Sequence, residues 1–297
     1  MRTDAVVKWY RPGTLDEALE IRARETVIPI AGATDLYVRY RRRSGLAPEF
    51  SAPLLAVGHL TELQGYSDEN GELRIGAGVP YADILSDGRT PVLLAAAVRE
   101  LAAPALRNVA TLGGNMCNAS PAADAACPLY ALDARCELRS ASRARTLPIA
   151  EFITGPGRTQ IEPDELLTAI IIPPGPGRVT TAIDDDATTR VLYRKVGTRR
   201  ANALSKLAVA AWASLSGGGV ESVGVALGAV APTVVRSHEV EADFVGSLES
   251  LREKTDAILA AYGRLVAPID DQRSTAEYRR EVALNLVKQF IEQSLLA

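Results

Sequence analysis

The chain begins with short segments. The spacing of their apolar residues changes from helical to extended from one segment to the next. The segment Thr14–Glu17 has the form of a capping box, and apolar residues follow it at helical spacing, so a helix is predicted to run to about Glu25. The apolar run Val27–Ile30 predicts a strand that ends in a tight loop. Thr34-Asp35 then offers an N-cap for a helix over Leu36–Arg43. The N-terminal segment is therefore predicted as helix, strand, loop and helix.

Similar patterns predict a second group of elements. Glycine and asparagine are too frequent in Asn108–Asn115 for a regular element, so this segment is expected to be a loop. Thr90-Pro91 and Ser120-Pro121 each combine a capping residue with a proline suited to the first helical turn. The expected elements are strands at 54–57 and 73–75 and helices at 80–85, 90–101 and 120–131.

A cluster of helix breakers divides the chain. Proline and glycine fill Pro173–Gly177, the acidic run Asp184–Asp186 follows, and the domain boundary is predicted there. Beyond it, three apolar segments, the last two joined at Gly217–Gly219, predict an antiparallel meander, and two segments of helical periodicity close the chain. The strands are expected at 191–196, 204–215 and 220–230, and the helices at 248–265 and 276–295.

Composition narrows the classes of function. The 297 residues suggest two domains, and their formal net charge of −3 argues against a basic face for nucleic acid. No apolar stretch approaches the roughly 18 residues of a membrane-spanning helix, and the first residues lack the apolar core of a signal peptide. These features predict a cytoplasmic protein without a membrane span.

Candidate metal ligands and nucleophiles are few. Cys117, Cys127 and Cys136 form no Cys-x-x-Cys pair and are expected to be buried thiols. His59 and His238 lie far apart in the sequence and are interpreted as structural or surface residues. We therefore predict neither a metal site nor a residue that acts as an acid–base catalyst.

Two loops of small residues are the best candidates for binding an anion. Ala31–Asp35 follows a predicted strand and Thr111–Asn115 precedes a predicted helix, and small residues let several backbone amides converge on a diphosphate. A phosphate loop with Gly-Lys and a complete dinucleotide fingerprint are both missing from the sequence. From the residues alone, the interpretation of these loops as ordinary turns is favoured over an anion-binding site.

Four longer strings carry a resemblance. Ala110–Asp124, Pro29–Leu36, Tyr193–Arg200 and Arg273–Arg280 resemble the FAD-binding medium subunit of molybdenum hydroxylases of the xanthine dehydrogenase and carbon monoxide dehydrogenase type. The first string is the most specific, and the last two are closer to xanthine dehydrogenase-like members. The strings span nearly the whole chain, so the resemblance covers both predicted domains.

The resemblance implies an α+β fold. An FAD-binding domain of the vanillyl-alcohol-oxidase (PCMH) type is expected over residues 1–176, with lobes at about 1–57 and 58–176. A smaller C-terminal domain of the molybdenum-hydroxylase flavoprotein family is expected over 187–297, with a three-stranded antiparallel sheet and helices.

The resemblance also implies the site residues. Asp124 matches the acid that bonds the sugar-like chain of FAD, and Lys195 matches the lysine near the flavin ring. Tyr193 lies two residues before Lys195 and so on the same strand face, and it is expected to lie over the isoalloxazine. Leu101 and Leu167 match apolar contacts. Residues matching the diphosphate loops are Pro29, Ile30, Ala31, Gly32, Ala33, Thr34, Asp35, Leu36, Thr111, Leu112, Gly113, Gly114 and Asn115.

The five site residues outside the two loops also have interpretations that need no cofactor. Asp124 could be an acid that balances a helix dipole, Lys195 a solvated strand lysine, and Leu101, Leu167 and Tyr193 core residues.

Two further features qualify the resemblance. Most relatives have Gly-Gly where this chain has Gly32-Ala33, and the added methyl narrows the approach to phosphate, so looser FAD binding is expected. A basic run of Arg39 and Arg41–Arg43 is expected to close the preceding helix, with a docking patch for a partner subunit as the alternative.

The function that the resemblance implies is electron transfer. FAD would take electrons from a [2Fe–2S] small subunit, which in turn receives them from a molybdopterin large subunit, and would pass them to NAD+ or another acceptor. A dimer of heterotrimers is expected. A self-sufficient FAD-dependent oxidoreductase of the same fold and a flavin-free structural subunit are the alternatives.

Overall fold

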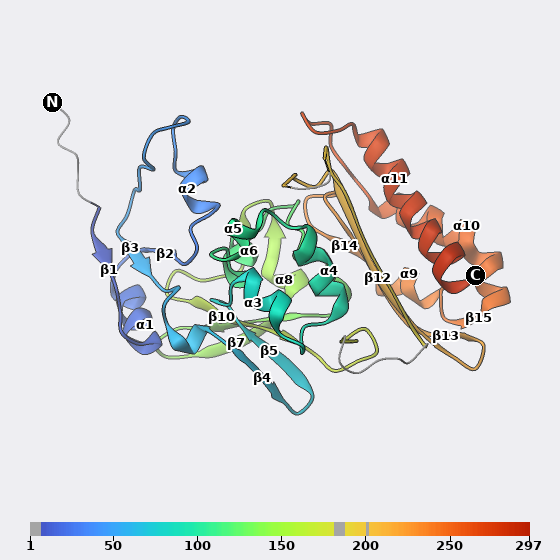
Figure 1. The fold of residues 1–297 in the computed structure, drawn as a ribbon, viewed down its shortest axis with the longest axis horizontal. Coiled ribbons are helices and arrows are strands. Elements are labelled where there is room, and N and C mark those ends of the chain that lie inside the picture. Colours follow the sequence, from blue (N-terminus) through green and yellow to red (C-terminus); the bar gives the residue numbers. More distant parts are fainter. Residues whose placement is uncertain (1–6, 181–187, 200–201) are drawn as a thin grey trace.

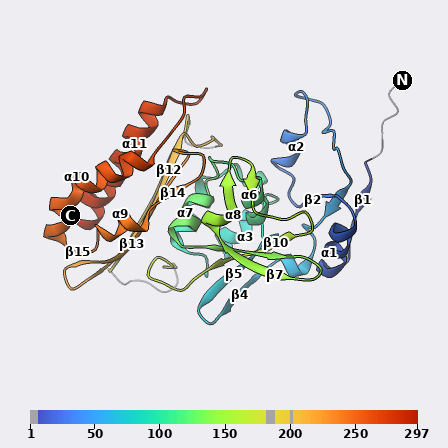
Figure 2. The ribbon, with the colours of Figure 1, turned by 180° about the vertical axis from the view of Figure 1, so that it is seen from behind.

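The computed structural model describes residues 7–180, 188–199 and 202–297. It contains three main sheets, which follow one another along the chain. The fold is α+β, as predicted. In both broad views the first lobe lies at one end, the second lobe in the middle and the C-terminal unit at the other end (Figures 1 and 2).

The first lobe is built on a parallel sheet with strand order β1-β3-β2. Its helix α1 begins as predicted, because Thr14 Oγ1 accepts the N–H of Glu17 at 3.2 Å. The Glu17 carboxylate accepts the N–H of Gly13 at 2.6 Å, one residue before the position used in a capping box. The elements are β1 (Trp9–Tyr10), α1 (Leu15–Arg24), β2 (Ile28–Ile30), α2 (Leu36–Arg39) and β3 (Leu54–Ala56).

Helix α2 is shorter than predicted. It ends at Arg39, so the expected extension to Arg43 is wrong and Arg41–Arg43 lie beyond the helix. Asp35 occupies the N-cap position, but its side chain makes no capping hydrogen bond and the helix buries no residue. A single turn without a cap or a buried face has little to stabilise further turns.

The second lobe contains a five-stranded antiparallel sheet in the order β4-β5-β10-β6-β7. Apolar side chains of the sheet and of the helices above it form one core. Its strands are β4 (Tyr66–Glu69), β5 (Glu72–Gly76), β6 (Arg135–Arg139), β7 (Ala144–Pro148) and β10 (Leu166–Ile172), with a small hairpin of β8 (Ile153–Gly155) and β9 (Arg158–Thr159). Its helices are η1 (Thr61–Leu63), α3 (Tyr81–Ser86), α4 (Val92–Glu100), α5 (Pro104–Arg107), α6 (Leu112–Asn118), α7 (Ala126–Ala131) and α8 (Ile149–Phe152).

Two predictions for this lobe are wrong. The segment Asn108–Asn115 is not a loop throughout, because helix α6 begins at Leu112 with Thr111 as its N-cap. A filled N-cap offsets the helix-breaking tendency of the two glycines. The helix expected from Ser120 begins only at Ala126.

The C-terminal unit contains the predicted antiparallel meander, formed by β11 (Thr189–Val196), β12 (Leu207–Ser216) and β13 (Gly219–Gly228). The prediction of three strands is incomplete, because β14 (Val235–Arg236) and β15 (Gly246–Ser247) also pair with β13. Two-residue strands carry no periodicity that a sequence pattern could detect. The helices are α9 (His238–Ala242), α10 (Leu248–Leu265) and α11 (Ala276–Gln289), which continues as the π-helical segment η2 (Phe290–Leu295).

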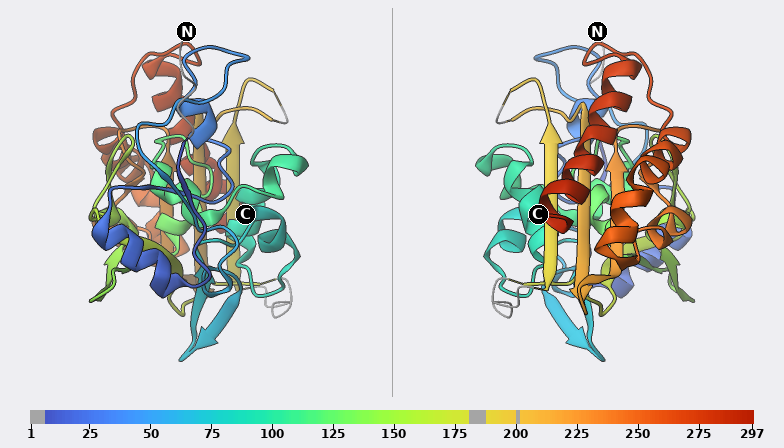
Figure 3. Two further views of the ribbon diagram at one scale, coloured as in Figure 1. Left: turned by 90° about the vertical axis from the view of Figure 1, so that its left-hand side faces the viewer. Right: turned by 90° about the vertical axis from the view of Figure 1, so that its right-hand side faces the viewer.

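The C-terminal sheet is a layer between two cores. Leu207 and Val209 face the core beneath α10 and α11, whereas Ala208, Ala210 and Trp212 join the core of the second lobe. The right-hand view of Figure 3 shows α10 and α11 covering the outer face of this sheet. The sheet thereby fixes β11 against the second lobe.

The predicted domain limits remain predictions, because the second lobe and the C-terminal sheet share one core. The acidic run Asp184–Asp186 lies outside the described residues. Among the helices that are described, none combines the length and the apolar character that crossing a bilayer requires.

Candidate functional site

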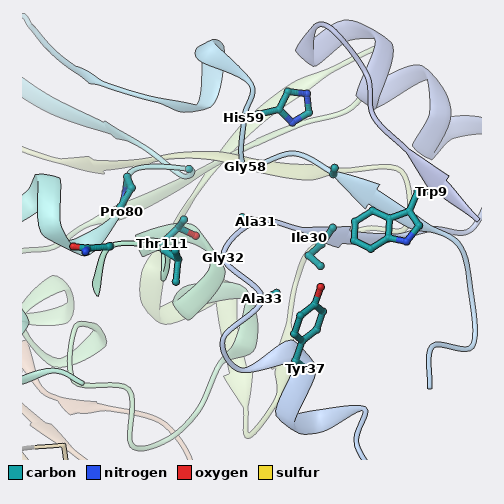
Figure 4. Close-up of a pocket in the computed structure, with 14 residues that line it drawn as sticks. Trp9, Ile30, Ala31, Gly32, Ala33, Tyr37, Gly58, His59, Pro80 and Thr111 are labelled. Carbon is teal, nitrogen blue, oxygen red and sulfur yellow. The ribbon is translucent and has the colours of Figure 1, made fainter. Parts of the chain in front are cut away.

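A cavity of about 480 Å³ lies between the first and the second lobe. Figure 4 shows the loop after β2 crossing it, with Thr111 and Pro80 on one side and Trp9 and Tyr37 on the other. Fourteen residues line it: Trp9, Ile30, Ala31, Gly32, Ala33, Tyr37, Ala56, Gly58, His59, Gly78, Pro80, Asn108, Val109 and Thr111.

The two loops predicted to bind an anion meet at this cavity. A Cβ atom on Gly32 would lie 1.8 Å from the main-chain oxygen of Val109, so only glycine permits this approach. Ala31, Gly32 and Ala33 of the first loop and Thr111 of the second line the same cavity. The fold therefore places backbone of the two lobes in direct contact at a hollow.

The first loop supplies free backbone donors. Within the described residues, the amides of Gly32, Ala33, Thr34 and Asp35 donate no hydrogen bond to another group of the protein. Four consecutive unused N–H groups are a feature of loops that bind anions.

The second loop contributes less than its glycines suggest. Leu112 N–H donates to the Val79 oxygen at 3.1 Å and Gly113 N–H to the Ala77 oxygen at 2.9 Å. Gly114 N–H donates to Thr111 Oγ1 at 3.1 Å, which caps α6. These three amides are used within the protein, and only the N–H of Thr111 itself donates to no described group. The expectation that both loops present free amides is therefore wrong for Leu112–Gly114.

Gly113 has a packing role. A Cβ atom there would lie 2.5 Å from the Cβ of Ala77, which follows β5. The glycine lets α6 approach the second-lobe sheet closely, and this explains the small residue without any ligand.

Ala33 has an unusual backbone. Its φ of 57° lies in the left-handed region, where an alanine is strained by about 1 kcal/mol relative to glycine. The Ala33 oxygen accepts the N–H of Tyr37 at 2.9 Å, which helps to hold this conformation.

Asp35 and Asn118 connect the two lobes beside the cavity. Asn118 Nδ2 donates to Asp35 Oδ2 at 3.2 Å and so joins the start of α2 to the end of α6. Pro29, Thr34, Leu36, Leu112, Gly113, Gly114 and Asn115 belong to the same two segments but do not line the cavity.

A buried ion pair forms a second cluster. Lys195 Nζ on β11 lies 2.6 Å from Asp124 Oδ2, and the side chains are only 6% and 9% exposed. Lys195 also donates to the main-chain oxygen of Glu100 at 3.0 Å, and the Ser205 hydroxyl donates to Asp124 Oδ1. The interpretation of Lys195 as a solvated lysine is therefore wrong.

Burial determines the electrostatics of this cluster. It raises the pKa of Asp124, and the ammonium of Lys195 offsets part of the increase. Tyr193 lies two residues before Lys195 on the same strand face, and burial raises the pKa of its phenol well above the usual range. The Tyr193 hydroxyl has no hydrogen-bond partner among the described residues.

Other predicted site residues lie in the core. Leu101 and Leu167 are buried in the second-lobe core and do not line the cavity. Leu101 directly follows Glu100, whose main-chain oxygen accepts from Lys195. The predicted residues thus fall into the cavity, its adjoining segments, and the buried cluster around Asp124.

Several site residues escaped the sequence analysis. Trp9, Tyr37 and His59 line the cavity, and His59 Nε2 lies 2.8 Å from the oxygen of Pro12. The buried hydroxyl of Tyr81 has no hydrogen-bond partner among the described residues. Of these, only the Gly-His pair after the predicted strand 54–57 resembles a small-residue loop that a sequence pattern could have found.

The site presents unused backbone N–H groups, and it offers few groups for acid–base work. Free amides and a threonine line one part of the cavity, and His59 is its one titratable side chain besides Tyr37. Among the residues described, no group of three or more His, Cys, Asp or Glu side chains is arranged to hold a metal ion.

Comparisons with known proteins show the family to which the chain belongs. A family described as "FAD binding domain in molybdopterin dehydrogenase" matches residues 5–175, and one described as "CO dehydrogenase flavoprotein C-terminal domain" matches residues 192–294. The chain is 30% identical to the xanthine dehydrogenase FAD-binding subunit of Escherichia coli O157:H7, covering 97% of this chain and 96% of the relative.

Two further relatives are carbon monoxide dehydrogenases. The medium chain from Afipia carboxidovorans is 28% identical, covering 96% of both chains. The structure of reconstituted CO dehydrogenase from Oligotropha carboxidovorans matches with a TM-score of 0.84 and 26% identity, covering 96% of both chains.

Proposed function

The chain belongs to the family of FAD-binding subunits of molybdenum hydroxylases of the xanthine and carbon monoxide dehydrogenase type, and from this membership we propose that it passes electrons from an iron–sulfur partner to NAD+ or another acceptor. FAD is its cofactor, and it is an oxidoreductase subunit. When bound, FAD supplies chemistry that accepts electrons singly and releases them in pairs.

The diphosphate of FAD is proposed to bind at the first loop. The free amides of Gly32–Asp35 and the N–H of Thr111 are the donors, because concentrated negative charge is best met by several converging backbone N–H groups. Gly32 is essential to this arrangement, since its lack of a side chain brings the loop against Val109. This contact between the first loop and the residues just before Thr111 is the observation that carries the proposal.

The buried cluster is proposed to meet the remainder of the cofactor. Asp124 retains acceptor capacity after bonding Lys195 and Ser205, because each carboxylate oxygen has two lone pairs, and this capacity suits the hydroxyls of the sugar-like chain. Lys195 supplies a fixed positive charge near the flavin ring, where the low dielectric strengthens its effect. Tyr193, Leu101 and Leu167 supply ring and apolar contacts.

The partners are proposed from the cysteine content of the chain and from its relatives. Three cysteines are too few for the four thiolates of a [2Fe–2S] cluster, so the cluster belongs on a small subunit. Hydroxylation then takes place on a molybdopterin large subunit, and two such heterotrimers form the complex. We place this assembly in the cytoplasm.

A glycine substitution tests the proposed position of the diphosphate. Gly32→Ala places a methyl group on the Val109 oxygen, so the purified chain should lose its visible flavin absorbance while keeping its far-UV circular dichroism. Gly88→Ala is the matched control, because a Cβ there meets nothing within 4 Å. Normal FAD content in the Gly32→Ala variant would refute this position.

Partners and acceptor need a separate experiment. Expression of the chain with its genomic neighbours should yield a complex that contains iron, molybdenum and FAD, and the reduced complex should reduce NAD+ if that is the acceptor. A chain that purifies alone and oxidises a substrate by itself would instead support a self-sufficient oxidoreductase.

A further inference from the structure

The basic run Arg39 and Arg41–Arg43 is not used by the proposed cofactor site. Helix α2 ends at Arg39, and none of the four arginines lines the cavity between the lobes. The segment between α2 and β3 projects as an arm from the first lobe in both broad views (Figures 1 and 2). Every residue from 41 to 47 is exposed. Residues 38–49 are called the arginine loop below.

Positive charge is concentrated in the arginine loop. Its four arginines and one glutamate give it a formal charge of +3, whereas the whole chain carries −3. Arg42 Nη2 lies 2.8 Å from Glu49 Oε2. The side chains of Arg39, Arg41 and Arg43 make no hydrogen bond or ion pair with any residue that the structure describes. Three like charges without an acidic partner repel one another, so they do not stabilise the loop itself.

Apolar side chains lie among these charges. Val38 is 66% exposed and Leu46 is 51% exposed, and helix α2 buries none of its residues. A single exposed apolar residue is ordinary on a protein surface. Here two of them are interleaved with free arginines, and arginine is enriched where proteins contact one another. The loop therefore has the composition of a surface that another protein covers.

The arginine loop is closed at its base. The N–H of Glu49 donates to the Tyr40 oxygen at 3.0 Å, and the rings of Tyr40 and Phe50 lie 5.0 Å apart between centroids. Within the loop, the N–H of Leu46 donates to the Arg43 oxygen at 3.3 Å. A loop that is formed before it meets a partner loses less conformational entropy on binding.

We propose that the arginine loop docks onto an acidic face of another subunit of the complex. This inference rests on the proposed function, because it requires the chain to work inside an assembly. A carboxylate can accept two parallel hydrogen bonds from one guanidinium group, and a protein surface can cover Val38 and Leu46 at the same time.

Two other kinds of partner fit the arginine loop less well. Nucleic acid would require a broader basic face than three free arginines on a chain whose net charge is −3. A lipid surface is best met by an amphipathic helix, and α2 is a single turn.

Charge reversal in the loop tests the proposal. The chain is co-expressed with its genomic neighbours, and mass photometry of the purified complex at stepwise dilution measures its dissociation constant. Arg41→Glu/Arg43→Glu should raise this constant about tenfold or more. Added NaCl should raise the constant of the wild-type complex, and it should have a smaller effect on the variant. The FAD content of the variant should be unchanged, because neither arginine lines the cavity.

Matched variants separate docking from net charge and from folding. Arg252→Glu/Arg264→Glu makes the same change in net charge at exposed positions of α10 and should leave the dissociation constant unchanged. Arg41→Gln/Arg43→Gln removes the charges without adding acids, so it decides the question if the reversal variant does not fold. Leu46→Ser should weaken assembly without changing its dependence on salt.

The possible outcomes are distinct. A reversal variant that folds and assembles with the wild-type dissociation constant would overturn the proposal. It would also be overturned if the reversal abolished only binding to phosphatidylglycerol vesicles, binding to duplex DNA, or self-association of the chain, because the loop would then serve a membrane, nucleic acid or a second copy. A wild-type chain that binds no FAD, or that joins no subunit carrying iron or molybdenum, would instead refute the proposed function.

Discussion

The ammonium of Lys195 and the carboxylate of Asp124 lie 2.6 Å apart although their positions are 71 residues apart in the sequence. The pair joins β11 of the C-terminal unit to the residues just before α7 in the second lobe. Because both side chains are nearly inaccessible to water, removing one partner leaves an uncompensated charge in the protein interior.

Lys195→Met should therefore destabilise the chain by about 3–5 kcal/mol. In that variant burial still raises the pKa of Asp124, and only the hydrogen bond from Ser205 opposes it, so the folded form binds a proton more readily than the unfolded form does. Stability should then be highest at acid pH and fall as the pH rises through the raised value. Urea unfolding at several pH values measures this trend. The double variant Asp124→Asn/Lys195→Met is the control and should lose the pH dependence; equal stability of the single variant and the wild type would contradict the prediction.

For Glu165 we expect a pH dependence of stability with the opposite sign. Burial alone would raise its pKa, but hydrogen bonds from Arg145, at 2.7 and 2.8 Å, and from the amide of Glu162 outweigh burial and hold the pKa below its ordinary value. The ionised Glu165 adds to the free energy of unfolding at pH values above the pKa of an unfolded glutamate. This stabilisation is lost as the pH falls through the lowered pKa of the folded form.

Glu165→Gln should accordingly lower Tm at neutral pH, with a difference from wild type that shrinks as the solution is acidified. Thermal unfolding from neutral to acid pH measures it. Glu253→Gln, on an exposed position of α10, is the control and should leave Tm unchanged throughout. A difference that stays constant with pH would show that the lost charge is not responsible.

Ala33→Gly should stabilise the chain by up to about 1 kcal/mol, because glycine adopts the left-handed backbone without strain. FAD affinity should be retained or increased, since the loop keeps its amides and loses a methyl group. Ala23→Gly, on an exposed position of α1, provides the contrast and should destabilise by about 1 kcal/mol. An equal loss of stability in both variants would mean that the backbone at residue 33 is not strained.

Gly224→Ala should destabilise the joint between the second lobe and the C-terminal sheet. A Cβ there would lie 2.3 Å from Nε1 of Trp212, whose indole donates to the Ala131 oxygen at 2.7 Å. Overpacking of this kind costs about 1–3 kcal/mol. Chemical unfolding followed by tryptophan fluorescence measures the change, with Gly88→Ala as the neutral control. An unchanged unfolding midpoint would show that the indole can move away freely.

Local signals in the sequence were sufficient where an element is stabilised by its own residues. Thr14 caps α1, the triple-glycine turn joins β12 and β13, and helix α10 spans the predicted residues Leu248–Leu265. Elements held mainly by distant neighbours were missed or misjudged. Strands β6 and β10 went unpredicted, and α2 stops after one turn because it buries none of its residues and has no side-chain cap.

The sequence alone determined the family, the fold class and the small-residue segments around Gly32 and Gly113, because these depend on local residue types in a specific order. Only the tertiary structure decided how those segments are used. It left the amides of Gly32–Asp35 free and occupied those of Leu112–Gly114, it buried Lys195 against Asp124, and it brought Trp9 and Tyr37 to one cavity. The physical reason is that a hydrogen bond, a buried charge and a cavity each depend on partners from distant segments, which no local pattern specifies.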